Sequence, residues 1–326
     1  MIVKRKFHEF SLGGDHEFTM SRKSNNRLVK LTDYLSLDGT LGRDENSSNL
    51  IAEIRSDPSV CPLEVTKSTK KIMENAIINN PDLLEFNWFA KSAIGGICCG
   101  SHVHTGHSKK IIPIENVIEA LDQYLGSLSL LLEDRRQGLK RREYNETPAG
   151  NIVQYGRKHD YRIVNHDTLD RYEYRTPSTF LSSMEIFKAF MCLSKIIIHE
   201  VIHNKHFRPK SFVNEDDFID VNANKVRKLF PHVWGDISRM YLFSEYNKYL
   251  EIIPYLVNKK LHWYPVDKSD MKVAWNLNLK PFQNIKKIPH LKVKSNDTGF
   301  DKSYSLDTLI RLFQEDKKEK PSRYLD

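Results

Sequence analysis

Four short segments of the chain each carry two polar or charged side chains two residues apart, with apolar residues beside them. Side chains alternate between the two faces of a β-strand, so residues i and i+2 point to the same face. One such pair alone is more typical of an ion pair or a solvent-facing strand than of a site. Four in succession predict a sheet with one chemically active face. The pairs are Asp15 and Glu17, Glu53 and Arg55, His102 and His104, and Glu173 and Arg175.

The residue types in these pairs suit a divalent metal ion and a phosphate group. Carboxylate oxygens with one imidazole are ligands for Mg²⁺ or Mn²⁺, which usually bridge phosphate oxygens. Arg157, Arg162 and Arg175 supply planar guanidinium groups that bind phosphate or carboxylate. The sequence contains no Gly-x-x-x-x-Gly-Lys-Ser/Thr loop. A nucleotide would therefore be held by metal ions and arginines on a sheet.

The net charge is +8, from 50 Lys and Arg against 42 Asp and Glu. This excess favours polyanionic partners without choosing between a nucleotide, a nucleic acid and an acidic polymer, and a solvated basic surface explains it equally well. A nucleic-acid-binding module without chemistry accounts for the charge. It does not account for the paired acids, which repel phosphate unless a metal lies between them.

Cysteine usage and hydropathy predict a cytoplasmic protein with no membrane partner. No apolar run approaches the roughly 18 residues needed to cross a bilayer. Residues 1–9 lack the apolar core of a secretory signal. The cysteines are too few and too irregularly spaced for a disulfide framework. They are Cys61, Cys98, Cys99 and Cys192.

The pattern of apolar residues predicts both helices and strands. A strand from Leu50 is expected to stop at Asp57-Pro58, and the basic segment 135–142 is expected to be a loop. Helices are expected over residues 63–79, 114–133 and 182–206, with mainly helical sequence from there to 261.

The order of the polar motifs resembles that of the phage-type carboxylate–amine ligases (amidoligases), a family of the glutamine synthetase superfamily. The resemblance covers about residues 10–180. It implies an α+β fold in which a curved antiparallel sheet forms a half-barrel, with helices packed on its convex side. The motifs are Gly14-Asp15-His16-Glu17-Phe18, Ala52-Glu53-Ile54-Arg55, Gly100-Ser101-His102-Val103-His104-Thr105-Gly106, Tyr155-Gly156 to Arg162, and Tyr172-Glu173-Tyr174-Arg175-Thr176-Pro177-Ser178.

The resemblance also implies an organisation and an activity. Residues 1–265 are expected to form the catalytic domain. The Lys-, Pro- and Asn-rich composition of residues 266–326 itself predicts a loop-rich extension with a short helix near 306–315 and a charged tail. The implied reaction is ATP-dependent formation of an amide or isopeptide bond through an acyl phosphate, with Mg²⁺ or Mn²⁺. The partners are a carboxylate substrate and an amine acceptor such as an amino acid, peptide, polyamine or modified macromolecule. Nucleic acid is compatible but not required, and a phage-encoded ligase would act in the host cytoplasm.

Roles carry over position by position. Glu173, Arg162 and Arg175 are expected to be catalytic, the two arginines by neutralising the transferred phosphoryl group. The pattern departs from the family at the second motif strand, where Glu53 is the one clearly placed carboxylate, and at bulky Lys158 and His159. The expected metal ligands are Asp15, Glu17, Glu53, His102 and Glu173, and the expected nucleotide contacts are Arg55, Arg157, Arg162 and Arg175.

The segment His199-Glu200-Val201-Ile202-His203 supports a different hypothesis, a zinc metalloprotease. In such enzymes histidines at i and i+4 of a helix bind Zn²⁺ and the glutamate activates water. The three polar residues fall off the main apolar face of their helix, which suits either a zinc site or an ordinary polar face. No Gly-x-x-His extension supplies a third ligand. The polar-face interpretation is therefore preferred.

Overall fold

The computed structural model describes residues 10–44, 49–94, 97–108, 114–143, 145–146, 152–153, 155–165, 169–263 and 270–277. In this part of the chain the main feature is a seven-stranded sheet of order β10-β11-β7-β1-β3-β2, with β4 also paired to β1. Every pairing is antiparallel and the sheet does not close. Its strands are β1 (Ser11–Arg22), β2 (Leu41–Arg43), β3 (Ile51–Ser59), β4 (Phe86–Phe89), β7 (Ser101–Ser108), β10 (Tyr161–Asn165) and β11 (Leu169–Tyr174).

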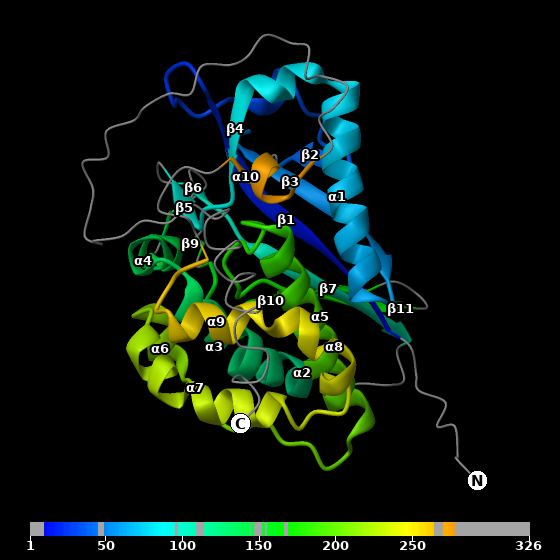
Figure 1. Ribbon diagram of the computed structural model, residues 1–326, viewed down its shortest axis with the longest axis vertical. Coiled ribbons are helices and arrows are strands. Elements are labelled where there is room, and N and C mark those ends of the chain that lie inside the picture. Colours follow the sequence, from blue (N-terminus) through cyan, green and yellow to red (C-terminus); the bar gives the residue numbers. More distant parts are fainter. Residues whose placement is uncertain are drawn as a thin grey trace, which may run out of the picture.

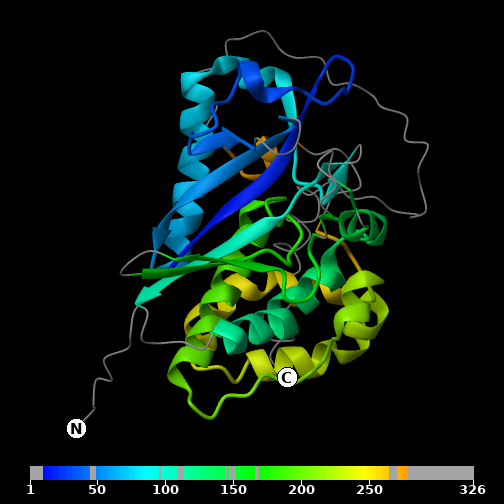
Figure 2. The same ribbon diagram turned by 180° about the vertical axis from the view of Figure 1, so that it is seen from behind.

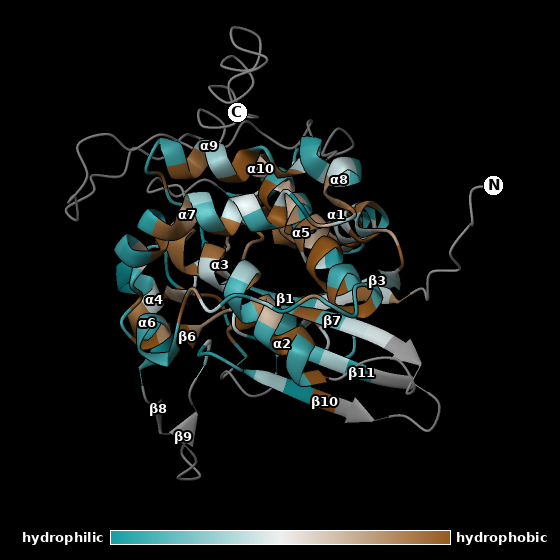
Figure 3. Cartoon of the chain, turned by 90° about the horizontal axis from the view of Figure 1, so that it is seen from below, coloured by the Kyte–Doolittle hydropathy of each residue, from teal (hydrophilic) through white to brown (hydrophobic). Residues whose placement is uncertain are grey.

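Helices cover one face of this curved sheet, as expected for the α+β fold. Figure 1 shows α1 beside the strands, and α7, α8 and α9 together with α5 in the lower half of the molecule. Figure 2 shows the strands fanning across the molecule from behind, and Figure 3 shows the helices and the strands β10 and β11 on opposite sides. The helices are α1 (Pro62–Asn79), α2 (Ile114–Leu121), α3 (Ser127–Leu132), α4 (Arg135–Arg142), α5 (Met184–His203), α6 (Glu215–Ile219), α7 (Ala223–Ile237), α8 (Phe243–Leu250), α9 (Ile252–Asn258) and α10 (Met271–Ala274).

Smaller elements complete the described chain. The segment η3 (Asp122–Gly126) is π-helical and joins α2 to α3 in one continuous rod. The remaining elements are two short 3-10 helices, η1 (Leu31–Asp33) and η2 (Pro81–Glu85), and two hairpins, β5 (Ala93–Ile94) with β6 (Ile97–Cys98) and β8 (Asn145–Glu146) with β9 (Ile152–Val153).

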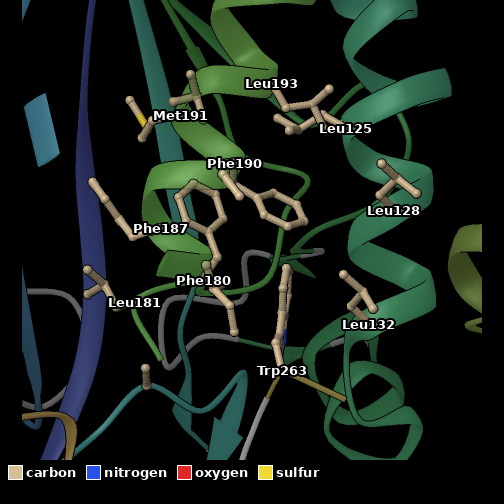
Figure 4. Packing of buried hydrophobic residues seen from close by; sticks show 14 of the residues in the cluster. Leu125, Leu128, Leu132, Phe180, Leu181, Phe187, Phe190, Met191, Leu193 and Trp263 are labelled. Atoms are coloured by element: carbon tan, nitrogen blue, oxygen red, sulfur yellow. The ribbon is translucent and has the colours of Figure 1, made fainter. Parts of the chain in front are cut away.

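The core lies between the helices and the sheet. Side chains from α5 meet those of the α2–α3 rod around a cluster of aromatic rings (Figure 4). Phe180 stacks on Phe190 at 5.1 Å between ring centroids, and Phe190 meets the edge of Trp263 at 4.9 Å. All three side chains are fully buried. Each stabilises the fold by about 2–3 kcal/mol through loss of apolar surface from water.

Strand alternation separates this core from the opposite face. On β1, Phe18 and Met20 are fully buried on the helix side, as are Ile54 on β3 and Val103 on β7. Their neighbours in sequence are the paired polar residues, which therefore point away from the helices. The period-two pattern thus places the polar pairs on one common face, as predicted.

The expected end of the strand at Asp57-Pro58 was wrong. β3 continues to Ser59, because Leu12 pairs with Ser59 whereas Gly14 pairs with Ser56. Two residues of β3 therefore face one residue of β1 in a bulge, a position where proline costs the ladder no hydrogen bond.

The expected loop at 135–142 was also wrong, because this segment forms α4. Asp134 caps the helix by accepting a hydrogen bond from the Gln137 N–H at 3.0 Å. The basic composition was misleading because Arg141 and Arg142 are buried and hydrogen-bonded rather than solvated.

Part of the expected C-terminal extension packs on the main body. In α10, Met271 is buried against β4, and the Trp275 indole N–H after the helix donates to the Leu181 carbonyl at 2.6 Å. Residues 278–326, including the expected helix near 306–315, lie outside the described residues. Within the described chain, no helix combines the length and the apolar character needed to span a membrane.

Candidate active site

The register of four neighbouring strands brings the polar pairs together. Asp15 of β1 lies opposite Arg55 of β3 on one side and His102 of β7 on the other. Glu17 pairs with Glu53 across the same β1–β3 boundary. The sequence alone gave four separate pairs, and the sheet order β11-β7-β1-β3 makes them one cluster.

Glu173 joins the cluster from the next strand. It pairs in register with His104 of β7 and with Arg162 of β10. The strand β11 ends at Tyr174, one residue before Arg175. The Arg175 side chain nevertheless points to the same side of the sheet as Glu173, since its Nε lies 3.5 Å from Glu173 Oε1.

His102 stands between two carboxylates. Its Nδ1 lies 3.1 Å from Glu173 Oε1 and its Nε2 lies 4.0 Å from Glu17 Oε2. Burial alone would lower the pKa of His102, but the negative charges of Glu17 and Glu173 outweigh it and raise the pKa above its usual value. His102 in turn holds the pKa of Glu173 well below its usual range, against the upward effect of burial.

His104 lies two residues after His102 on β7, so its side chain points to the same face of the sheet. Its Nε2 lies 3.2 Å from Asp15 Oδ2 and 4.0 Å from Glu173 Oε2. Burial lowers the pKa of His104 to about 4, although Asp15 and Glu173 act in the opposite direction. His104 is therefore a neutral imidazole at physiological pH, with one ring nitrogen facing carboxylates.

The carboxylates also influence one another. Burial, followed by repulsion from Asp15, raises the pKa of Glu53 to about 7. Burial likewise raises the pKa of Glu17. Glu17 is held by the Gly100 N–H, which donates to its Oε2 at 2.7 Å. Buried acids that crowd one another favour a bound cation, because a cation removes both the repulsion and the desolvation cost.

Arginines surround this group of acids. Arg162, whose side chain is 57% exposed, donates to Glu173 Oε1 at 2.6 Å. Arg55 forms an ion pair with Glu53 and donates to the Leu37 and Gly39 carbonyls, both at 2.8 Å. Phosphate oxygens are natural partners for such exposed and partly exposed guanidinium groups.

Arg157 is placed differently from the other three expected nucleotide contacts. Its Nη1 lies 4.0 Å from Glu215 Oε1 on α6, and its carbonyl accepts a hydrogen bond from the Thr176 hydroxyl at 2.7 Å. The sequence pattern grouped Arg157 with Arg162 and Arg175 by type. In the fold, its guanidinium is directed to a helix.

Sequence reasoning gave no role to Tyr155 or Arg141, and both belong to the site. The Tyr155 ring lies between two guanidinium groups, those of Arg141 and Arg175, each with Cζ 4.6 Å from the ring centroid. Its hydroxyl donates to Glu17 at 3.2 Å and contacts His102 Nε2. Tyr155 thereby fixes the arginine after β11 relative to the acids of β1.

Arg171 was also missed, although it lies two residues before Glu173 on the same alternating strand. Its Nε is buried and, within the described residues, has no hydrogen-bond partner. Its charge acts on His104, lowering the pKa of that imidazole alongside burial. The period-two pattern could have identified it, because Arg171, Glu173 and Arg175 follow one another at a spacing of two residues.

The donor set fits a divalent cation. Neither His102 Nδ1 nor His104 Nε2 forms a hydrogen bond to any described residue, although each faces a carboxylate oxygen at 3.1–3.2 Å. Two ligands of one octahedral ion, each about 2.1 Å from it, lie about 3 Å apart. Within the described residues, the atoms of the expected ligands approach one another in pairs, and no three of them lie within 4.8 Å of one another.

A second group of metal-type side chains lies outside the predicted site. Glu119, Asp122 and His159 place ligand atoms within 4.8 Å of one another. The Lys158 ammonium already lies 2.9 Å from Glu119 Oε2, and His159 Nε2 lies 2.7 Å from the same oxygen. A cation would have to displace an ammonium group, so hydrogen bonding explains this group better than metal binding.

The zinc-site hypothesis finds no support on α5. The Glu200 carboxylate accepts from Asn204 Nδ2 at 2.6 Å and from the Tyr241 N–H at 2.9 Å, so both oxygens serve the local fold. The His199 ring stacks on Tyr241 and lies 4.2 Å from the His203 ring, centroid to centroid. Within the described residues, no third ligand groups with these two histidines.

Comparisons with known proteins identify a family and a similar fold. A family model described as "Phage phiEco32-like COOH.NH2 ligase-type 2" matches residues 12–277. No curated protein matches the chain in sequence. A chain in the crystal structure of the complex between the prokaryotic ubiquitin-like protein Pup and its ligase PafA is 9% identical with a TM-score of 0.50, covering 78% of this chain and 66% of that chain.

A bifunctional glutathione synthetase from Pasteurella multocida is 10% identical with a TM-score of 0.45, covering 83% of this chain and 52% of that chain. The chain thus spans less than two thirds of the length of either structure. At this identity, the likeness to the first of them is one of fold. None of these matches supports the zinc metalloprotease alternative.

Proposed function

The chain belongs to the phage phiEco32-like COOH.NH2 ligase-type 2 family, and on that premise we propose that it is a carboxylate–amine ligase that uses ATP to join its substrates through an acyl phosphate. The substrate carboxylate attacks the γ-phosphorus of ATP and ADP leaves. The amine then attacks the acyl carbon, inorganic phosphate leaves, and the amine loses a proton to a carboxylate of the cluster. The observation that supports this most is the position of His102 between Glu17 and Glu173.

The acids and the imidazole of the sheet face would hold the metal. Asp15, Glu17 and Glu53 supply oxygen ligands from two adjacent strands, and His102 and Glu173 supply ligands from the next two. When bound, Mg²⁺ or Mn²⁺ neutralises phosphate oxygens and orients them for in-line transfer. The work of the chain is to hold these ligand groups on one face of the sheet at the spacing of its neighbouring strands.

Arginines supply the remaining positive charge. Arg175 is fixed by Tyr155 and by Asp160, whose Oδ1 lies 3.8 Å from its Nη1. Arg162 is more exposed and contacts Glu173, so it can move to a phosphate or substrate carboxylate entering beside it. Positioning and electrostatic stabilisation are the main contributions of a protein to phosphoryl transfer. These two side chains are suited to give both.

Release of ADP in the presence of defined substrate pairs tests the proposal. Purified protein with Mg²⁺ and ATP is offered a panel of carboxylates and amines, including amino acids, peptides and polyamines. We expect ADP release that requires both a carboxylate and an amine. We also expect a product whose mass equals the mass of the acid plus the mass of the amine minus one water. ADP release that needs neither substrate would indicate a nucleotidase and would contradict the proposal.

A further inference from the structure

Asp122 is a fully buried carboxylate on the helix side of the sheet, behind the proposed site. It belongs to η3, in the middle of the α2–α3 rod. Its Oδ1 accepts a hydrogen bond from the Tyr174 hydroxyl at 2.8 Å and lies 3.3 Å from the Thr176 hydroxyl. Its Oδ2 accepts from the His159 N–H at 3.0 Å. One carboxylate therefore connects a helix, the end of β11 and the turn before β10.

These contacts lie on both sides of Arg175. Tyr174 and Thr176 are its neighbours in sequence, and both side chains point to the face opposite Glu173 and Arg175. The Arg175 backbone is held as well, since its N–H donates to the Asp160 carbonyl at 2.7 Å and its carbonyl accepts from Arg141 at 2.8 Å. Asp122 thus fixes Tyr174 and Thr176, and the positions of these two residues determine the position of the Arg175 backbone between them.

The helix is adapted to this contact. A methyl group added at Gly126 of η3 would lie 2.7 Å from the Tyr174 hydroxyl oxygen, so glycine leaves the space that the hydroxyl occupies. The π-helical geometry adds a residue to this turn, and such turns are frequent at functional sites. Two features of the same turn therefore serve the approach of Tyr174 to the rod.

We propose that Asp122 is a positioning residue for the ligase reaction, acting through Tyr174 and Thr176 to set the Arg175 guanidinium against the phosphoryl group in transfer. This inference rests on the proposed function. Asp122 touches neither substrate nor metal in this account. Its effect is on the placement of a catalytic arginine, where a small displacement costs rate rather than binding.

The substitution Asp122→Asn tests this directly. The amide has the same shape but a single acceptor oxygen, so it cannot accept from Tyr174 and from the His159 N–H at the same time. We expect kcat to fall about 10- to 100-fold, as small misplacements of catalytic groups do, with KM for ATP changed less than about 3-fold. Tyr174→Phe removes one donor alone and serves if the first variant does not fold; its expected kcat loss is in the same direction and smaller.

Asp217→Asn is the matched control. Asp217 of α6 is also a buried carboxylate, but it accepts from the Asn214 N–H at 2.9 Å and forms an ion pair with Lys225 of α7. We expect it to lower thermal stability without lowering kcat. Equal kcat losses in the Asp122 and Asp217 variants would show a general effect of stability and would overturn the proposal.

A double-mutant cycle with Arg175→Lys separates positioning from other roles. If Asp122 acts through Arg175, Asp122→Asn costs much less rate in the Arg175→Lys background than in the wild type. Fully additive losses would overturn the inference. Failure of the proposed function itself is recognised separately, because the wild-type protein would then show no substrate-dependent ADP release.

Discussion

His102 Nδ1 and Glu173 Oε1 lie 3.1 Å apart across the boundary between β7 and β11, and both side chains are almost fully buried. Within the described residues, this nitrogen has no hydrogen-bond partner. These two buried metal-ligand groups face each other, and Glu17 lies on the far side of the imidazole ring. A divalent cation would complete such a site.

Glu173→Gln should therefore abolish most ligase activity. The amide keeps the shape of the side chain but removes a charge that faces His102, Arg162 and Arg175. We expect kcat to fall at least about 100-fold, with a lower thermal midpoint because the buried groups that face Glu173 lose their partner charge. Steady-state ADP release and a melting curve measure the two effects. Wild-type turnover in this variant would discard the assignment of Glu173.

His102→Ala should weaken metal binding. Loss of one ligand is expected to reduce Mn²⁺ affinity about 10- to 100-fold, which a Mn²⁺ titration followed by electron paramagnetic resonance measures. His232 lies exposed on α7 and provides the matched control as His232→Ala. If both variants bind Mn²⁺ as the wild type does, the cation is held elsewhere.

Gly156→Ala should disrupt the stack of Tyr155 between Arg141 and Arg175. Gly156 has φ +76°, and an added Cβ would lie 1.7 Å from Arg141 Nη1. We expect a loss of about 1–3 kcal/mol in the free energy of unfolding together with a lower kcat. Gly235 of α7 has no atom within 4 Å of such a Cβ. Gly235→Ala should stabilise the helix by about 0.5–1 kcal/mol and leave kcat unchanged. Similar results for the two variants would contradict the stack's role.

Lys272 gives the stability a defined pH dependence. Burial lowers its pKa from 10.5 to about 8, although Asp270 acts in the opposite direction. Between these two values the unfolded chain binds more protons than the folded one, so this group adds stability as pH rises through that window. Relative to Lys272→Met, the wild-type free energy of unfolding should rise by about 3 kcal/mol from pH 8 to pH 10.5. Urea unfolding at several pH values measures it, and a constant difference between the two proteins would show that Lys272 titrates normally.

Glu200→Gln should affect the fold and not the chemistry. The variant weakens the acceptor for Asn204 and for the Tyr241 N–H, so we expect a loss of about 1 kcal/mol in the free energy of unfolding. Ligase turnover should stay at the wild-type level. Stoichiometric zinc in the purified protein, with peptide cleavage lost in the variant, would instead favour the protease hypothesis.

Alternation along the strands was enough to predict the active face of the sheet, because side-chain direction in a strand is a local property. Spacing alone assigned Asp15 and Glu17 to one face of their strand, and did the same for the other pairs. The order of the strands is a long-range property, so the contact between His102 and Glu173 required either the resemblance to a family or the structure.

The residues that were missed depend on such long-range contacts. Arg141 resembles a solvated residue in a basic run, yet it is buried because its guanidinium donates to the Thr176 and Arg175 carbonyls. Asp122 looks like an ordinary polar position in an apolar helix. Its role depends on Tyr174, 52 positions away in sequence, which no local pattern reveals.

The most direct test of the proposed chemistry follows an oxygen atom. Once the panel has identified an acid, that acid is supplied with ¹⁸O in its carboxylate, and the phosphate released during amide formation is analysed by mass spectrometry. An acyl phosphate requires one carboxylate oxygen to leave with the phosphate, so we predict that each phosphate carries one ¹⁸O. Amide formation with unlabelled phosphate would contradict the mechanism.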